Sequence, residues 1–393
     1  MIDLALARIF PRWLHVWAIV TVAVAAVLLL FGESVTTLRA GMADPDWPTR
    51  PWHLALESRE RWTAGYLVEH THRILGFLVG GLMSVLALAA WAYEPRKGLR
   101  WTALVALIAL LAAFGYFHGQ MMAQLGAPTV HVPIPSTAAT LVTLAAVLGV
   151  CVAAARRPTP GTGPRILTVV ALVAVMVQGL LGGLRVRLHE LVGLELSAVH
   201  GTFATLVLAL LVCIPVLTAR GNPEPLPNEA RRKLLWQTTC LVLFTILQIA
   251  WGAWIRHFPD RVSSRLHLLF AFVVVGFATL VIKQAMSDSV SRHRFRWPAG
   301  VMMGLITLQV LLGVEAWVGK FMTGEAVDLQ RVPPVGPSII RTVHAHVGAW
   351  VLAVGVIFAV MVRRNPPQAV GPEKAASVDW QSAPRPEPAL AGW

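Results

Sequence analysis

Residues 69–76 of this chain read Glu69-His70-Thr71-His72-Arg73-Ile74-Leu75-Gly76. They open a run that is otherwise apolar as far as Trp91. Charged groups at membrane depth cost several kcal/mol each, so they seldom occur there without a function. Glu69 and His72 are three residues apart and share one helix face. Gly76 lies one turn further along that face, where its missing side chain leaves room for a broad, flat group.

The composition of the whole chain is that of a membrane protein. It has 393 residues, of which 56% are hydrophobic and 13% charged, and the mean hydropathy is +0.64. This balance favours an all-α polytopic membrane protein over a soluble domain. The three cysteines are spread through apolar runs without metal-ligand or redox spacing, which argues against thiol chemistry.

Ten apolar runs are long enough to cross a bilayer, for which a helix needs roughly 20 residues. The predicted spans are Trp13–Phe31, Leu67–Trp91, Trp101–Gln120, Ser136–Ala155, Ile166–Leu184, Ser197–Leu217, Leu234–Trp254, Leu266–Ile282, Ala299–Val318 and Ile339–Val362. The first is interpreted as a retained span, because a cleaved signal peptide has a shorter apolar core.

The distribution of charge orients these spans. With the N-terminus inside, 20 of the 33 basic residues but only 8 of the 20 acidic ones fall on the inner side. The inner side then carries a net charge of +12 and the outer side +1. The positive-inside rule therefore predicts that both termini are cytoplasmic. It also explains the basic excess without a nucleic-acid partner, and leaves membrane lipid as the surrounding partner.

Four histidines share one local pattern, a small residue four positions later on the same helix face. The pairs are His72 with Gly76, His200 with Ala204, His267 with Ala271 and His344 with Gly348. Each pair lies near the start of a span that runs inward, so we expect all four histidines at a similar depth near the outer face.

This pattern predicts metal ligands that bind a porphyrin. Two imidazoles from different helices, each beside a small residue, suit haem iron in a helix bundle. Sequence order pairs His72 with His200 and His267 with His344. His346 competes with His344, because Ala349 lies close behind it. A zinc or dinuclear site would require carboxylates or cysteines close to the histidines, and only Glu69 is near.

A second repeated element is a glutamine followed four residues later by glycine. It occurs as Gln178 to Gly182, Gln248 to Gly252 and Gln309 to Gly313. Small residues at this spacing let helices approach closely. Arg185 and Arg256 follow the first two elements at the outer mouth, where they could pair with haem propionates, as could Arg73. Contact with lipid phosphate explains these arginines equally well.

In these features the chain resembles the haem A synthase family of cytochrome oxidase assembly proteins. Glu69-x-x-His72-Arg73 is similar to the family signature at the start of its second helix, and residues 39–48 (RAGMADPDWP) resemble its first outer loop. The glutamine–glycine element ending at Arg185 and the later histidines complete a resemblance that covers most of residues 13–362.

The resemblance implies two pseudo-repeated four-helix bundles and the oxidation of the C8 methyl of haem O to a formyl group through hydroxylated intermediates. His72 and His200 would bracket the substrate haem, with Glu69 as the catalytic carboxylate, and His267 and His344 would hold a haem b cofactor. The two bundles would then occupy residues 1–219 and 220–362. The Pro- and Ala-rich composition beyond Val362 separately predicts a disordered cytoplasmic tail at 363–393. The implied location is the cell inner membrane, with both haem sites toward the outer face.

Two features of this chain differ from those of the family. Many members carry a cysteine pair in the first outer loop, and this chain has none there. The family has eight spans, whereas this chain has ten, the additions lying at about residues 101–155. The resemblance implies haem O synthase and oxidase assembly factors as partners, together with an electron donor that the sequence does not identify. The histidine pairs alone fit equally well a two-haem b-type electron carrier of the membrane.

Overall fold

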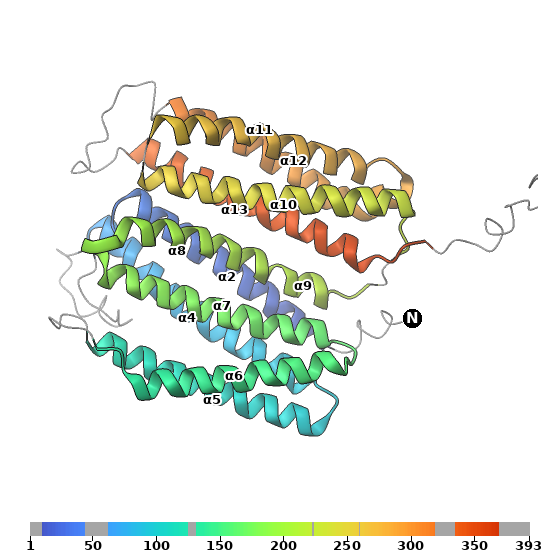
Figure 1. The fold of residues 1–393 in the computed structure, drawn as a ribbon. Helices are drawn as coiled ribbons and strands as arrows, with labels where there is room; N and C mark the ends of the chain where they lie inside the picture. The colour runs from blue at the N-terminus through green and yellow to red at the C-terminus, as the bar shows by residue number, and fades with distance from the viewer. Residues whose placement is uncertain are drawn as a thin grey trace, which may run out of the picture.

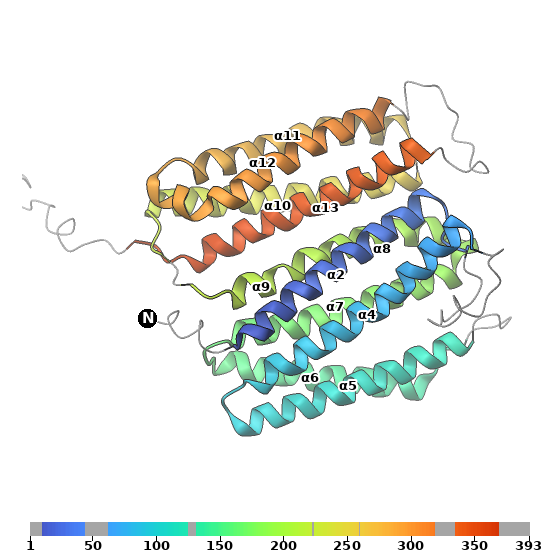
Figure 2. The same cartoon turned by 180° about the vertical axis from the view of Figure 1, so that it is seen from behind.

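The chain folds into a bundle of long, roughly parallel and antiparallel helices (Figures 1 and 2). A computed structural model describes residues 10–43, 62–124, 131–221, 224–258, 260–318 and 335–368. Among these residues, ten helices are long and apolar enough to span a membrane. The prediction of an all-α polytopic membrane protein is therefore confirmed.

The helices, in chain order, are α2 (Arg12–Thr37), α4 (Ala64–Ala92), α5 (Lys97–Ala123), α6 (Ile134–Arg156), α7 (Thr162–Arg187), α8 (His189–Leu211), the short α9 (Cys213–Thr218), α10 (Asn228–His257), α11 (Arg261–Ala285), α12 (Ser289–Trp317) and α13 (Val335–Arg364). Polar side chains begin several of them. Thr63, Asp260 and Asp288 each accept a hydrogen bond from a backbone N–H in the first turn of α4, α11 and α12. Nine of the ten predicted spans coincide with a single helix, and the tenth, Ser197–Leu217, extends from α8 into α9.

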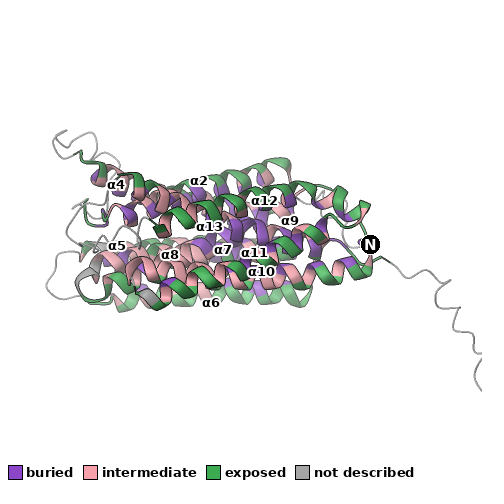
Figure 3. Ribbon diagram, turned by 90° about the horizontal axis from the view of Figure 1, so that it is seen from above, coloured by how far each residue is buried: buried purple, intermediate pink, exposed green. Residues whose placement is uncertain are grey.

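The helices form two groups of four with a seam between them. The buried apolar side chains of α2, α4, α7 and α8 form one core, to which α5, α6 and α9 also contribute, and those of α10, α11, α12 and α13 form a second. The seam is closed by α13, which is the most buried of the spans. Ala349 and Ala353 of α13 belong to the first core, whereas Val354 and Phe358 belong to the second. Buried residues gather between the helices and exposed ones face outward (Figure 3).

The two additional helices form a hairpin at one edge of the bundle. α5 packs against α4, and α6 packs against α7 (Figure 1). Large apolar side chains on the hairpin are exposed, among them Trp101, Val105 and Val142. Such side chains face the hydrocarbon when the helices span a bilayer.

A buried ion pair fixes the base of this hairpin. Glu94, between α4 and α5, lies 3.0 Å from the Arg165 guanidinium at the start of α7, and both side chains are fully buried. Arg96 donates a 2.5 Å hydrogen bond to the same carboxylate. Burial alone would raise the pKa of Glu94, but the hydrogen bond from Arg96 and the charge of Arg165 together hold it below its usual value. The carboxylate is therefore charged at neutral pH and connects the hairpin to the first group of helices.

The tail begins later than expected. We expected disorder from residue 363, but Arg363 and Arg364 complete α13. Asn365 then accepts a 2.9 Å hydrogen bond from Arg231 of α10, and Pro367 pairs with Leu226 in an isolated bridge. Backbone hydrogen bonds thus extend the folded part as far as Gln368. The rest of the predicted tail lies outside the described residues.

Candidate haem-binding site

All four predicted histidines lie in the half of the bundle nearest the loops that follow α2, α7, α10 and α12. This is called the loop end below, and the opposite end, where α2 begins and α13 ends, is called the terminal end (Figure 1). His72 lies on α4, His200 on α8, His267 on α11 and His344 on α13. Each lies within the first half of its candidate membrane span, which for His200 is Leu191–Thr218. The predicted common depth follows from these positions.

Each imidazole packs against a glycine of the helix that pairs with its own. A Cβ atom placed on the glycine would lie only 2.8–3.2 Å from the ring Cε1 in all four cases. The pairs are Gly32 with His72, Gly182 with His200, Gly252 with His267 and Gly313 with His344. Contacts this close mean that a side chain at any of the four glycines would force the neighbouring imidazole to shift, so the glycines suit the observed positions of the rings.

The residue four positions before each glycine also contacts the histidine. Gln178 Nε2 lies 3.1 Å from His200 Nδ1 and donates to the His200 carbonyl. Gln248 Nε2 donates a 2.8 Å hydrogen bond to the His267 carbonyl.

The remaining two histidines are also contacted by the residue four positions before their glycine, which is a glutamine in one case and a leucine in the other. Gln309 Nε2 lies 3.4 Å from His344 Nε2. In the fourth site the position is Leu28, whose carbonyl lies 3.1 Å from His72 Nδ1. The glutamine–glycine element therefore serves to hold the histidines, and α2 carries a degenerate copy, Leu28 to Gly32, that the sequence analysis missed.

The small residues four positions after the histidines do not share one environment. A Cβ atom on Gly76 would meet nothing within 4 Å, so space beside it is open. Gly348 instead lies against the Gln309 carboxamide, 3.1 Å from where its Cβ would be. The glycine on the neighbouring helix, rather than the small residue on the same helix, is the feature shared by all four sites.

The fold brings the histidines together in two pairs. His72 and His200 are close enough for their charges to interact, and so are His267 and His344. Each pair belongs to one of the two helix groups. These are the pairs that sequence order suggested.

The histidine pairs fit a haem on the chemistry of their atoms. His267 Nδ1 and His344 Nδ1 are buried without a hydrogen-bond partner, and so are the Oε1 atoms of Gln178, Gln248 and Gln309. Buried polar atoms are usually hydrogen-bonded, so the unpartnered ring nitrogens of His267 and His344 are available to bind iron, whereas the carboxamide oxygens do not bear on haem ligation. His72 Nδ1 can donate to the Leu28 carbonyl, which leaves Nε2 free to bind iron.

Each pair also has an arginine at the loop end. Arg185 Nε donates a 2.6 Å hydrogen bond to Ser197, and its guanidinium packs against Gly41. Its charge interacts with Glu69, Arg73 and His72. Arg185 therefore belongs to the N-terminal site.

Arg256 has the corresponding place in the C-terminal site. Its guanidinium donates to the Glu33 carbonyl at 2.7 Å and to the Thr37 hydroxyl, both on α2. Its charge interacts with that of His344. Unlike Arg185, it reaches across the seam into the other helix group.

The N-terminal pair has a buried carboxylate beside it. Glu69 accepts a 2.7 Å hydrogen bond from Arg73 one turn later, and both side chains are at least 95% buried. Arg73 is therefore engaged by Glu69 rather than free to bind a propionate alone. His70, off the ligand face, is fully buried and stacks on Tyr66 at 5.5 Å between ring centroids.

His346 has a different environment from His344. Its Nδ1 lies 3.1 Å from a carboxylate oxygen of Glu33, and its Nε2 accepts a 3.1 Å hydrogen bond from Trp350. Both ring nitrogens are thus engaged, whereas His344 faces Gly313 and Gln309. This geometry favours His344 as the ligand.

Glu33 is the residue that sequence reasoning overlooked. It follows Gly32 directly, is 7% exposed and connects α2 to α13 through His346. A carboxylate just beyond the apolar run that ends at Phe31 was the available signal. Of the resemblance in the first outer loop, residues 44–48 lie outside the described residues.

Among the residues that the structure describes, no three His, Cys, Asp or Glu side chains gather in a way that could hold a bare metal ion. A haem requires only axial ligands from the protein, and each site offers two imidazoles.

Comparisons with protein-family models, curated proteins and solved structures found no match to this chain.

Proposed function

We propose that this protein is a haem A synthase, which oxidises the C8 methyl of haem O to a formyl group through hydroxylated intermediates and supplies haem A for cytochrome c oxidase. The observation that carries the proposal is an asymmetry between two otherwise similar sites. Both have paired histidines packed on glycines, but among the described residues a buried carboxylate, Glu69, lies within one helical turn of a paired histidine in the N-terminal site alone.

In this proposal His267 and His344 hold a haem b cofactor, which supplies one-electron transfer when bound. His72 and His200 bracket the haem O substrate. Conversion of the methyl to the formyl group adds an oxygen atom and releases electrons and protons, so an external oxidant must supply that atom and accept those electrons. Glu69 would lie beside the reacting edge and accept or return the protons. Arg73 holds that carboxylate in place through its 2.7 Å hydrogen bond. Arg185 and Arg256 contribute positive charge for the propionates of the two haems.

The proposed location follows from charge. The terminal end carries most of the basic residues, which supports a cytoplasmic placement of both termini in the cell inner membrane. The histidine pairs then lie toward the outer face. Haem O synthase and oxidase assembly factors are proposed partners, with an external electron donor.

The test is co-expression with a source of haem O, followed by extraction and identification of the bound haems. We expect haem A or its hydroxylated precursor in the wild-type protein. Glu69→Gln should keep both haem spectra and lose at least tenfold of the oxidised product. Glu195→Gln is the matched control, because Glu195 is exposed near the start of α8. Bound haem without any oxidised product in the wild type would reject the synthase proposal.

A bis-histidine electron carrier is the second candidate. It is supported by the similarity of the two sites, since four repeated glycine–histidine contacts could serve to hold two haems that are not modified. For a carrier, both haems extracted would be haem b. Glu69→Gln would then change neither pigment composition nor the rate of haem reduction.

A further inference from the structure

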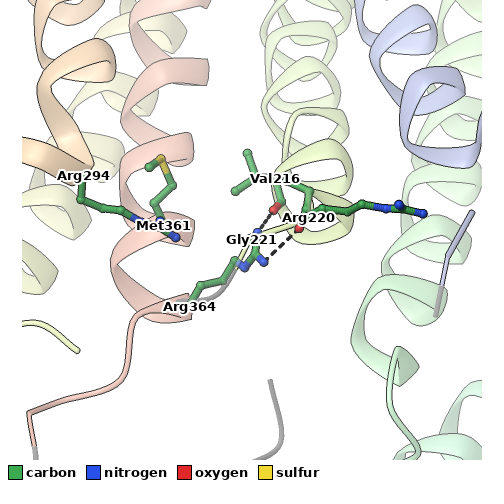
Figure 4. A pocket seen from close by; sticks show the side chains of 7 residues that line it. Val216, Arg220, Gly221, Arg294, Met361 and Arg364 are labelled. Carbon is green, nitrogen blue, oxygen red and sulfur yellow. Dashed lines mark hydrogen bonds between the residues drawn. The ribbon is translucent and has the colours of Figure 1, made fainter. Parts of the chain in front are cut away.

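A cavity of about 210 Å³ lies at the terminal end, the end of the bundle opposite to the histidines. Its walls come from both helix groups. Val216 and Ala219 belong to α9 and the residue after it, Arg294 to α12, and Met361 and Arg364 to α13 (Figure 4). The cavity therefore opens at the seam between the two groups, where α9 and α13 meet.

The lining combines positive charge with apolar surface. Its charged residues are all arginines, Arg220, Arg294 and Arg364, and Val216 and Met361 supply apolar walls. The side chain of Arg220 extends away from the others and is exposed (Figure 4). Two guanidinium groups, from α12 and α13, are therefore left to set the charge inside the cavity.

The two inner arginines differ in what they contact. Arg364 donates to the carbonyls of Val216 and Ala219, at the end of α9. Those contacts fix its position. Arg294 Nε is buried without a hydrogen-bond partner. A buried, unpaired guanidinium nitrogen is costly, and an anion at this point would satisfy it.

The depth of the cavity points to a lipid. Arg364 is the last residue of the α13 span, so the cavity lies at the level of the phospholipid headgroups. Basic pockets between transmembrane helices on the cytoplasmic side bind anionic headgroups. A free phosphate ion would use the arginines but not the apolar walls, whereas a phospholipid uses both. From this combination we infer that the cavity binds the phosphate of an anionic phospholipid, which joins the two helix groups at their inner end.

The experiment measures lipid binding to the purified, full-length protein. After delipidation in a neutral detergent, phosphatidylglycerol, phosphatidylcholine or inorganic phosphate is added, and retained lipid is counted by native mass spectrometry. We expect one retained phosphatidylglycerol, at least fivefold less phosphatidylcholine, and a rise in thermal stability with phosphatidylglycerol but not with inorganic phosphate.

Variants locate the lipid. Arg294→Gln should weaken phosphatidylglycerol binding about fivefold, or about 1 kcal/mol for one arginine near the headgroups, and Arg294→Lys should restore part of it. Arg232→Gln, an exposed arginine of α10 that does not line the cavity, is the charge-matched control and should bind as the wild type does. Equal retention by Arg294→Gln and Arg232→Gln would overturn the assignment. So would equal stabilisation by inorganic phosphate and phosphatidylglycerol, since the cavity would then bind a free anion.

Discussion

Both helix groups contain a pair of histidines packed against glycines of neighbouring helices, and the groups differ in the other residues around those histidines. In the C-terminal group, His267 and His344 each contact a glycine and a glutamine carboxamide of the neighbouring helix. In the N-terminal group, His200 has the same environment, but His72 meets the carbonyl of Leu28 in place of a carboxamide. The N-terminal group also buries Glu69 beside its ligands. The histidine–glycine contacts that both groups share are suited to holding a haem. We expect chemistry on the haem at the N-terminal pair, where Leu28 and Glu69 differ from the C-terminal pattern.

The groups also differ in how they meet. Arg256 and His346 of the C-terminal group both reach across the seam to α2, where they contact the carbonyl and the carboxylate of Glu33. Gly32, the adjacent residue, touches His72. A single turn of α2 therefore contacts residues of both sites, so we expect the two proposed haem positions to be coupled through helix packing rather than through a loop.

Removal of one ligand is the change with the largest expected effect. His344→Ala should remove the haem of the C-terminal group and halve the haem-to-protein ratio, because an axial ligand is lost. His346→Ala should retain that haem, since His346 instead contacts Glu33 and Trp350. Haem content and the low-spin absorption spectrum measure both variants. Loss of haem in His346→Ala but not in His344→Ala would reverse the assignment.

Filling a glycine should have the next largest effect. In Gly252→Val the new side chain would overlap His267 Cε1, which lies 3.0 Å from the Cβ position, and displace the ring. We expect most of the C-terminal haem to be lost while the N-terminal haem is retained. Gly276→Val is the matched control, because a Cβ on this exposed residue of α11 meets nothing within 4 Å. Equal haem loss in both variants would point to general misfolding instead.

Much of the fold could be predicted from apolar run lengths alone. A membrane span must satisfy its own backbone hydrogen bonds, so about 20 apolar residues leave little choice but a helix. The four histidines were found for a related reason, because a polar side chain in an apolar run stands out. The sequence showed the glutamine–glycine elements but did not indicate that each glycine contacts a histidine, since glycine is common in membrane helices for packing alone.

The contacts across the seam could not be predicted from the sequence. Glu33 and His346 are 313 residues apart, and nothing local to either indicates which helix it will face. The ambiguity between His344 and His346 had the same origin, because both have small residues nearby on α13. Only the packing of α13 between α2 and α12 separates their roles. The start of the tail was misplaced because its contact with Leu226 is equally long-range.

Breaking the seam should have a moderate effect on stability. Glu33→Ala removes the carboxylate that faces His346 and leaves buried polar groups unpaired, which costs about 1–3 kcal/mol. We expect a lower thermal unfolding temperature in detergent and a shift in the spectra of both haems, because α2 contacts both sites. Glu33→Gln retains the shape and an acceptor oxygen, so its loss should be smaller. A shift confined to one haem would show that the two sites are not coupled through α2.

The smallest expected effect comes from exchanging the residue four positions before the glycine, which is Gln309 beside His344 and Leu28 beside His72. Gln309→Leu gives His344 the apolar neighbour that His72 has in Leu28, and removes a carboxamide 3.4 Å from its ring. One hydrogen bond is worth about 1 kcal/mol, so haem retention in the C-terminal group should fall about fivefold. The reverse change, Leu28→Gln, should strengthen haem retention in the N-terminal group and slow release of its product. Both are measured as haem transfer to an excess of apomyoglobin. If neither change alters the transfer rate of its own haem, the carboxamides only pack the helices, and Glu69 alone accounts for the difference between the two sites.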